Sequence, residues 1–193
     1  MDKSQLRHEA RRRRRGLGQV HRQQAQLAFA QTLVARRQRE GWTAVAAYVG
    51  TASEASLAPW FASLAATSPA LRLFLPAIDG QGAMSFRAWR PGEPLDDGPF
   101  GIAQPAAAAM AADVGMFDAI LLPLLGFDRH GTRLGSGAGY YDRALAPIAA
   151  AAPRPRIVGI AFAVQRFDAL PRDAWDIPLD AIVTEDGWLD LPA

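Results

Sequence analysis

The 193-residue sequence contains no cysteine, a single lysine and only three histidines. Without cysteine the chain has no disulfide bond, no thiolate zinc site and no cysteine nucleophile, a composition that fits a reducing compartment. The histidines, His8, His21 and His130, have no metal-ligand spacing among them. We expect His130 to lie on a surface loop. Chemistry in this protein therefore has to come from arginine, the lysine, carboxylates, hydroxyls and backbone groups.

Long apolar runs are also missing. No run approaches the roughly 20 residues that span a bilayer, and the basic N-terminal segment is followed by polar residues rather than by the apolar core of a signal peptide. We therefore expect a cytoplasmic protein with no membrane association. Half of the residues are hydrophobic, and no repeat or linker divides the chain, so we expect one domain over residues 1–193.

Positive charge is concentrated at one end. Residues 1–39 hold eleven Lys or Arg and two acids, whereas residues 40–193 hold ten and seventeen. The run Arg11–Arg15 resembles a nucleic-acid patch. However, successive residues of a helix point all around its axis, so we expect the run to be solvated or paired with the acidic body, and nucleic-acid binding is the weaker interpretation. An arginine-rich presequence is a further alternative.

The hydrophobic pattern alternates helices with short strands. It predicts two helices between Lys3 and Arg39, separated near Gly16-Leu-Gly18, the second with a core-facing stripe of Leu27, Ala30, Leu33 and Val34. Strands are predicted at 43–49, 71–75, 83–89, 117–123, 156–162 and 181–184, and further helices at 54–66 and 140–150. This alternation predicts an α/β protein, a three-layer α/β/α sandwich with a mainly parallel sheet. Residues 90–105, rich in proline and glycine, are expected to form a loop over the ligand.

A glycine-rich segment directly after the apolar strand at 117–123 is the best candidate site, PLLGFDRHGTRLGSGAGYYDR at 123–143. Gly135, Gly137 and Gly139 permit positive φ and close approach of an anion to backbone N–H groups. A helix from Tyr140 would point its positive dipole end there. Neither common nucleotide fingerprint matches. In the alternative interpretation the glycines only permit a tight turn.

Charged residues surround this segment and extend to the N-terminus. Arg133 has the fork geometry for phosphate oxygens, and Asp142 is a candidate ligand for a nucleotide's Mg²⁺; the alternative is an ion pair of Arg133 with Asp128 or Asp142. Lys3 and Arg7 are four residues apart, so on a helix they can approach one polyphosphate together. Without such a ligand they would be an exposed basic pair near a frayed end.

The run Gly126–Arg143 closely resembles the signature of the 5-formyltetrahydrofolate cyclo-ligase family, also called 5,10-methenyltetrahydrofolate synthetases. Other segments match in the same order: Lys3-x-x-x-Arg7, Tyr48-Val49 with Glu54, Leu75-Pro76, Met84-Ser-Phe86 with Trp89, Phe117–Pro123, Gly159–Phe162, Gln165, Leu170-Pro171 and Asp176–Glu185. The sequence departs from the pattern at Gln104, Ser136, Ala138 and Trp175. None of these departures removes a group with an obvious chemical role.

The resemblance implies the architecture of sugar-phosphate isomerases and coenzyme A transferases. It also implies ATP- and Mg²⁺-dependent conversion of 5-formyltetrahydrofolate to 5,10-methenyltetrahydrofolate, with release of ADP and phosphate, and we expect a monomer. Its catalytic residues would be Arg133 and Lys3, and its metal ligands Asp142 and Asp176. Its ATP site would comprise Lys3, Arg7, Arg133, Leu134, Gly135, Ser136, Gly137, Ala138, Gly139, Tyr140 and Tyr141. Its folate site would comprise Val49, Glu54, Ser136, Gly137, Ala138, Gly139 and Tyr140.

Three alternatives stay open at the level of the sequence. Glu54 ends a Thr51-x-x-Glu54 capping-box spacing, so its carboxylate could cap the start of a helix. It could both cap a helix and contact folate only if each of its two oxygens served one of these roles. An enzyme for a phosphorylated sugar or an acyl-coenzyme A on the same fold would need an acid-base carboxylate. A non-catalytic folate- or nucleic-acid-binding protein would keep the loop without turnover.

Overall fold

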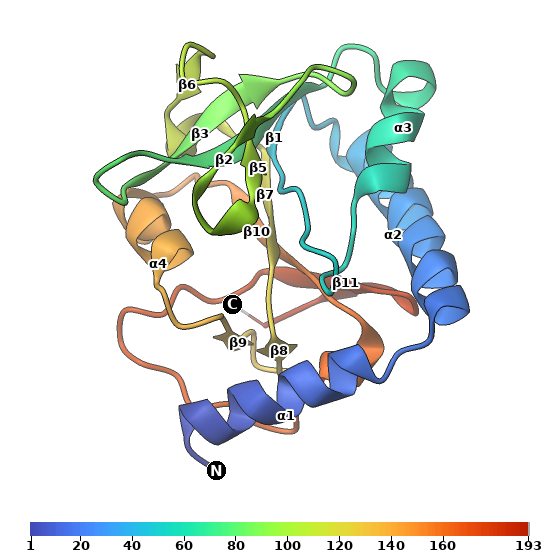
Figure 1. Ribbon diagram of the computed structural model, residues 1–193, viewed down its shortest axis with the longest axis vertical. Coiled ribbons are helices and arrows are strands. Elements are labelled where there is room, and N and C mark those ends of the chain that lie inside the picture. The colour runs from blue at the N-terminus through green and yellow to red at the C-terminus, as the bar shows by residue number, and fades with distance from the viewer. Residues whose placement is uncertain (193) are drawn as a thin grey trace.

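The computed structural model describes residues 1–192 (Figure 1). The helices are α1 (Lys3–Arg15), α2 (Gln19–Glu40), α3 (Ala58–Thr67) and α4 (Tyr140–Leu145), with 3₁₀ turns at Pro99–Gly101, Val114–Met116, Ala146–Ile148 and Ala163–Gln165. The strands are β1 (Ala44–Ala46), β2 (Arg72–Ile78), β3 (Met84–Trp89), β4 (Asp96–Asp97), β5 (Ala103–Gln104), β6 (Ala111–Ala112), β7 (Ala119–Pro123), β8 (Gly126–Phe127), β9 (Arg133–Leu134), β10 (Arg156–Ile160), β11 (Ala181–Thr184) and β12 (Gly187–Asp190).

A large, mainly parallel sheet forms the centre of this mixed α/β fold. Its strand order is β12-β11-β10-β7-β1-β2-β3-β6. The pairs from β11 to β2 are parallel, and antiparallel strands complete both edges. The apolar strand predicted at 117–123 is confirmed as β7, between β1 and β10, and its residues Ala119–Leu122 are buried. A strand covered on both faces needs such a continuous apolar run.

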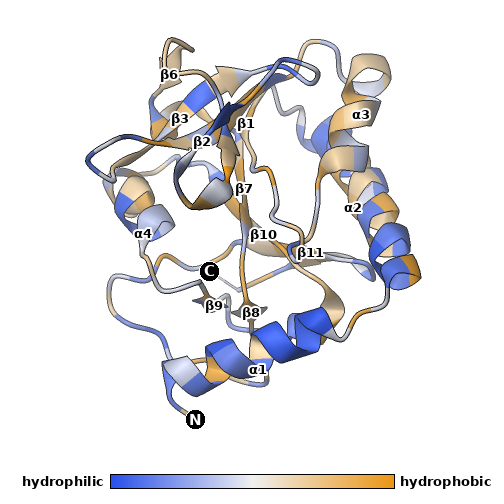
Figure 2. Cartoon of the chain, in the orientation of Figure 1, coloured by the Kyte–Doolittle hydropathy of each residue, from blue (hydrophilic) through white to orange (hydrophobic). Residues whose placement is uncertain are grey.

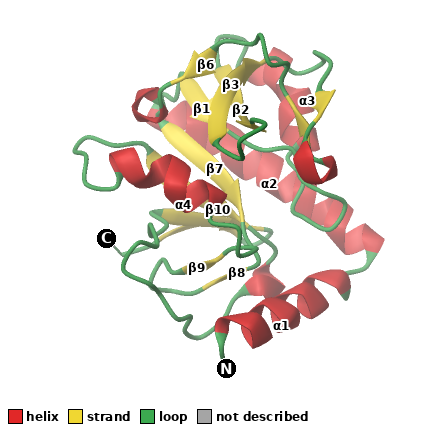
Figure 3. Ribbon diagram, turned by 60° about the vertical axis from the view of Figure 1, so that its left-hand side comes forward, coloured by secondary structure: helices red, strands yellow, loops and turns green. Residues whose placement is uncertain are grey.

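Helices pack on both faces of the sheet. On one face, Phe29 and Leu33 of α2 and Trp60 of α3 pack with sheet residues in one core cluster. On the other face, Leu145 of α4 and Ile148 join a second cluster. Figure 3 shows α4 in front of β7 and α2 behind the sheet. Among residues 1–192, no helix has both the length and the apolarity needed to cross a bilayer.

The two N-terminal helices are separated where predicted, but the expected stripe on α2 is partly wrong. Ala30 and Leu33 are buried, whereas Leu27 is 56% exposed. Phe29 is fully buried, and it determines which face of α2 meets the sheet. Two residues along a helix differ by about 200° around the axis, so Leu27 has to point to solvent.

Three predicted boundaries are also corrected. Helix α3 begins at Ala58 rather than at 54, because Pro59 fits its first turn and residues 51–54 form a separate turn. Strand β2 continues through Pro76 to Ile78, since β1 pairs with it only as far as Phe74 and needs no N–H from Pro76. The helix predicted at 140–150 ends at Leu145, followed by a 3₁₀ turn that contains Pro147.

Two features lie between the sheet and the candidate site. The glycine-rich segment 123–143 begins at the end of β7 as predicted, but its first part forms the β8–β9 hairpin, which lies between β7 and the glycines at 135, 137 and 139. Helix α1 lies apart from the sheet (Figure 1) and is largely hydrophilic (Figure 2). It packs through Leu6 and Ala10 on a small apolar cluster formed by Leu125, Leu134, Phe167 and Leu170.

Candidate functional site

A pocket of about 400 Å³ lies beyond the carboxyl ends of three central strands. Tyr48 and Val49 follow β1, Ile78 ends β2 and Pro123 ends β7, and all four line the pocket. Open α/β sheets bind their ligands at this edge. Helix α1 contributes one wall through Lys3, Arg7, Arg11 and Arg14.

The pocket brings together every residue that the sequence predicted for the site, with one exception. The predicted residues that line it are Lys3, Arg7, Val49, Glu54, Arg133, Leu134, Gly135, Ser136, Gly137, Gly139, Tyr140, Tyr141, Asp142 and Asp176. Ala138 does not line the pocket: it is exposed, and its carbonyl oxygen accepts a hydrogen bond from Arg143 Nη1 at 2.8 Å.

The glycine loop contacts α1. Gly137 has φ +108° and Gly139 has φ +66°, whereas Gly135 does not adopt a positive φ. Arg7 Nε donates a hydrogen bond to the Gly135 carbonyl at 3.1 Å, and a Cβ on Gly137 would lie 3.3 Å from Arg7 Cζ. The loop therefore depends on glycine at 137 for both conformation and space. Helix α4 has only six residues, so it sums few peptide dipoles toward this loop.

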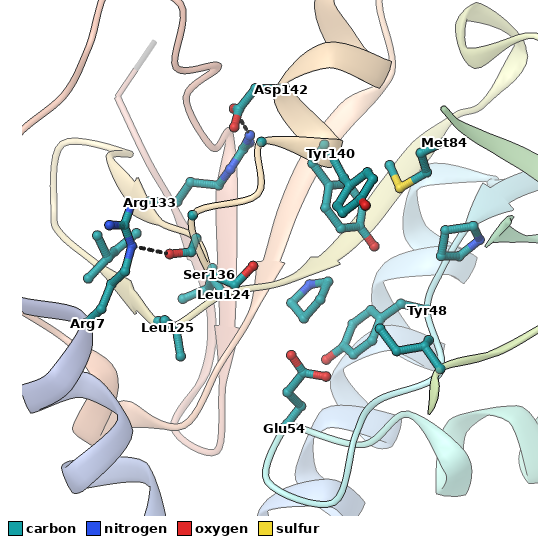
Figure 4. A pocket seen from close by; sticks show the side chains of 18 of the residues that line it. Arg7, Tyr48, Glu54, Met84, Leu124, Leu125, Arg133, Ser136, Tyr140 and Asp142 are labelled. Atoms are coloured by element: carbon teal, nitrogen blue, oxygen red, sulfur yellow. Dashed lines mark hydrogen bonds and ion pairs between the residues drawn. The ribbon is translucent and has the colours of Figure 1, made fainter. Parts of the chain in front are cut away.

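Arg133 is held in one place at the pocket wall. Its side chain is 6% exposed, its Nη1 donates to the Ile177 carbonyl at 2.9 Å, and its Nη2 pairs with Asp142 (Figure 4). Burial lowers the pKa of Arg133, and the carboxylates of Asp142 and Asp176 oppose that shift. Of the two partners considered for Arg133, Asp142 is the one found. Asp128 instead accepts backbone N–H bonds, and His130 is exposed as expected.

Lys3 lies between two carboxylates. Its Nζ is 2.6 Å from Asp173 Oδ2 and 3.1 Å from Asp176 Oδ2. Burial lowers the pKa of Lys3, but the bonds to both aspartates outweigh it and leave the pKa raised. Sequence reasoning missed Asp173. The only signal was its position three residues before Asp176, and that spacing alone does not indicate contact with a lysine at the other end of the chain.

The predicted metal ligands have free donor atoms in the pocket. Asp142 uses Oδ1 for Arg133, and Asp176 uses Oδ2 for Lys3 and for the Asp173 N–H at 2.8 Å. Within residues 1–192 the second oxygen of each makes no hydrogen bond to protein. In that described part, no group of three His, Asp or Glu could hold a metal alone. Two carboxylates fit Mg²⁺, which usually completes its shell with phosphate oxygens and water.

Glu54 divides its two oxygens between a turn and the pocket. Oε2 accepts from the Thr51 N–H at 2.9 Å and from Thr51 Oγ1 at 3.0 Å. These are capping-box contacts, but no helix begins at Thr51, so the predicted helix cap is a turn. Oε1 lies 4.0 Å from Arg14 Nη1, and Figure 4 shows the carboxylate pointing toward Tyr48. Burial raises the pKa of Tyr48, and the charge of Glu54 adds to that shift.

Three of the four departures from the family pattern, Gln104, Ser136 and Trp175, line the pocket as well. Gln104 Oε1 accepts from the Ile78 N–H at 3.0 Å, and its Nε2 donates to the Ile78 carbonyl at 3.4 Å. A glutamate could not make the second bond, so glutamine suits this position. Ser136 and the exposed Trp175 also line the pocket. The predicted loop over the ligand contributes Pro99 and Ile102 beside Gln104.

The fold and the pocket together define a ligand-binding α/β protein of the open-sheet class, with charged groups along one wall. Comparison with known proteins narrows this class. The sequence matches the 5-formyltetrahydrofolate cyclo-ligase family over residues 1–185. The chain belongs to this family.

Individual members of this family are similar to this chain over most of its length. A 5-formyltetrahydrofolate cyclo-ligase from Haemophilus influenzae is 28% identical over 92% of this chain and 94% of its own. The solved structure of the 5,10-methenyltetrahydrofolate synthetase from Aquifex aeolicus is 31% identical, covers 100% of this chain and 94% of its own, and superposes with a TM-score of 0.81. The synthetase from Mycoplasma pneumoniae is 26% identical, covers 94% of this chain and 98% of its own, and superposes at 0.74.

Proposed function

We propose that this protein catalyses the ATP-dependent cyclisation of 5-formyltetrahydrofolate to 5,10-methenyltetrahydrofolate, with release of ADP and phosphate. The observation that carries the proposal is a single pocket that joins Lys3, Arg7 and the glycine loop to Val49 and Glu54. Family membership supplies the reaction, and the pocket supplies cations for a polyphosphate and a carboxylate for a pterin within one cavity.

The chemistry requires alignment rather than a covalent nucleophile. Transfer of the γ-phosphoryl group of ATP to the formyl oxygen activates a poor leaving group. N10 of the folate then attacks the formyl carbon, the ring closes and phosphate leaves with that oxygen. Catalysis thus consists of bringing the phosphoryl group to the formyl oxygen and stabilising the charge that develops there.

Each end of the pocket has a role in this proposal. Lys3 and Arg7 of α1, with Arg133 and the backbone of Leu134–Tyr141, bind the phosphates of ATP; Lys3 and Arg133 stabilise the transferred group. Asp142 and Asp176 hold Mg²⁺, which when bound neutralises phosphate charge. Glu54 accepts hydrogen bonds from pterin N–H groups through Oε1, since Thr51 already occupies Oε2. Val49 and the loop at Ser136–Tyr140 complete the folate site.

The proposal also covers the molecule as a whole. The chain would form one domain and act as a cytoplasmic monomer. The helices on both faces of the sheet support a three-layer sandwich like that of sugar-phosphate isomerases and coenzyme A transferases.

The decisive experiment is a spectroscopic assay for the methenyl product. Purified protein with 5-formyltetrahydrofolate, ATP and Mg²⁺ should form the chromophore and release one phosphate per turnover. Omitting ATP or adding a chelator should abolish both signals. Folate binding without turnover would indicate a non-catalytic binding protein, and activity that resists the chelator would contradict the role of Mg²⁺.

A further inference from the structure

One arginine of the Arg11–Arg15 run differs from its neighbours. Arg12 is 69% exposed and pairs with Glu9, and Arg13 also pairs with Glu9 and lies over the Phe167 ring. The side chain of Arg14 is only 8% exposed, and it lines the pocket. Arg11 and Arg14 of the run both line the pocket, and Arg14 is the one whose side chain is buried.

The polar contacts of the Arg14 side chain lead to the turn that carries Glu54. Its Nη2 donates to Ser53 Oγ at 2.7 Å, and its Nη1 lies 4.0 Å from Glu54 Oε1. Its Nε is buried and has no hydrogen-bond partner among residues 1–192. An unpaired buried N–H is destabilising, so packing alone does not account for an arginine here.

Stability of the turn has another source. Arg22 of α2 donates to the Ser53 carbonyl at 3.1 Å and to the Leu17 carbonyl at 3.2 Å, and it also bonds the Arg14 carbonyl. Arg22 therefore links the Ser53 backbone to α2, which carries it, and to the end of α1. What Arg14 adds is a guanidinium facing the carboxylate of Glu54.

We propose that Arg14 is a positioning residue that orients the Glu54 carboxylate and supplies its counter-charge at the folate end of the pocket. The inference rests on the proposed function. Thr51 holds one oxygen of Glu54, and Arg14 faces the other, so the carboxylate is fixed before the ligand arrives. The side chains at 3, 7, 11 and 14 recur at helical spacing along one face of α1. The same helix thus serves the nucleotide end and the folate end.

The test compares Arg14→Met and Arg14→Lys with Arg15→Met, a matched control on the exposed side of the same helix. Arg14→Met should raise the KM and the Kd for 5-formyltetrahydrofolate about tenfold, as expected for loss of a charged contact. The KM for ATP should stay within about twofold. Arg14→Lys keeps the charge without the fork and should fall between wild type and Arg14→Met. Arg15→Met should match wild type.

A double-mutant cycle with Glu54→Gln shows whether Arg14 acts through Glu54. In that background Arg14→Met should change folate affinity by less than about twofold, because the group it positions is already lost. Three outcomes would each overturn the inference. In the first, the effects of Arg14→Met and Glu54→Gln on folate affinity are fully additive. In the second, Arg14→Met changes the KM for ATP and the KM for folate equally and lowers the Tm, and in the third, Arg14→Lys has unchanged folate affinity. The folate affinity of Arg14→Lys compared with that of wild type tests the inference even if Arg14→Met does not fold. A wild-type protein with neither turnover nor folate affinity would refute the proposed function itself, and the role of Arg14 with it.

Discussion

Lys3 Nζ lies 2.6 Å from Asp173 Oδ2, although 170 positions separate the two residues in the sequence. Asp176 shares the same ammonium group. The candidate nucleotide lysine is therefore fixed by two carboxylates, one of which is the proposed metal ligand. Because Lys3 uses only Oδ2 of Asp176, the other oxygen of this carboxylate could hold Mg²⁺ while the ion pair with Lys3 is kept.

Separate variants of Lys3 and Glu54 should affect different ligands. Lys3→Ala should mainly weaken ATP binding, since it removes a cation from the phosphates and leaves Asp173 and Asp176 unneutralised. Glu54→Gln should mainly weaken 5-formyltetrahydrofolate binding, by about 1–3 kcal/mol for a charged hydrogen bond. Titration calorimetry with each ligand, together with Tm, provides the measurement. If Glu54 serves only the Thr51 turn, Glu54→Gln would lose about 1 kcal/mol or less of stability and bind folate normally.

Asp142→Asn should impair both metal use and stability. The change removes the charge of a proposed metal ligand and also the counter-charge of the buried Arg133 guanidinium. We therefore expect a loss of about 1–3 kcal/mol in unfolding free energy and a higher Mg²⁺ concentration for half-maximal activity. Denaturant unfolding and Mg²⁺ titration measure the two effects. Asp186→Asn, at an exposed aspartate in the β11–β12 turn, is the control. An unchanged Mg²⁺ requirement would remove Asp142 from the metal site.

Two alanine substitutions in the glycine loop should behave differently. Gly137→Ala forces a Cβ into a backbone with φ +108°, 3.3 Å from Arg7 Cζ, and such a conformation costs roughly 1–3 kcal/mol. We expect reduced stability and weaker ATP binding. Gly135→Ala has no positive φ and no atom within 4 Å of the new Cβ, so it should be tolerated. Equal affinities and equal Tm values for the two variants would contradict the described loop conformation.

Prediction from sequence worked where local signals were strong. The apolar run at 117–123 predicts the strand β7, and the glycines at 16 and 18 predict the break between α1 and α2. The edge strands β6 and β12 were not predicted, because two-residue or half-polar strands exist only through pairing with a neighbour. Leu27 was misassigned because its spacing fits a helix stripe equally well until packing of Phe29 selects the face.

The candidate site shows the same limit. Nearly all of the predicted site residues line the pocket, since they lie in segments that match the family motif, but they account for only about half of its lining. Asp173 and Arg14 were not predicted as site residues because their roles depend on contacts with residues far away in the sequence. Within a run of five arginines, nothing in the sequence distinguishes the one that α1 turns toward Glu54. Ala138 belongs to the same motif, although it is exposed and does not line the pocket.

Stability toward acid should depend on Asp118. Burial raises the pKa of Asp118, but hydrogen bonds from the backbone N–H groups of Thr43 and Ala44 and from the Thr43 hydroxyl outweigh it and hold the pKa below its usual value. The ionised form is thus favoured in the folded state. Its stabilising contribution is complete above about pH 4, the value for an unfolded aspartate, and is lost as pH falls through the lower folded pKa.

The matching measurement is Tm from pH 6 to pH 3 for wild type and Asp118→Asn. Wild type should be the more stable at pH 6, and the difference should shrink toward pH 3, where the aspartate becomes protonated. A difference in Tm that stays constant over this range would show that the ionisation of Asp118 contributes nothing to folding.

The attachment of α1 also bears on the energetics of ligand capture. This helix forms a wall of the pocket, and it is attached by Leu6 and Ala10 in a small apolar cluster and otherwise by polar contacts such as those of Lys3 and Arg7. Any molecule in which α1 is undocked lacks Lys3 and Arg7, so the apparent affinity for nucleotide is the intrinsic affinity reduced by the docked fraction. A ligand that contacts both α1 and the body would stabilise the docked state, so backbone amides of α1 should exchange hydrogen more slowly in its presence than in its absence.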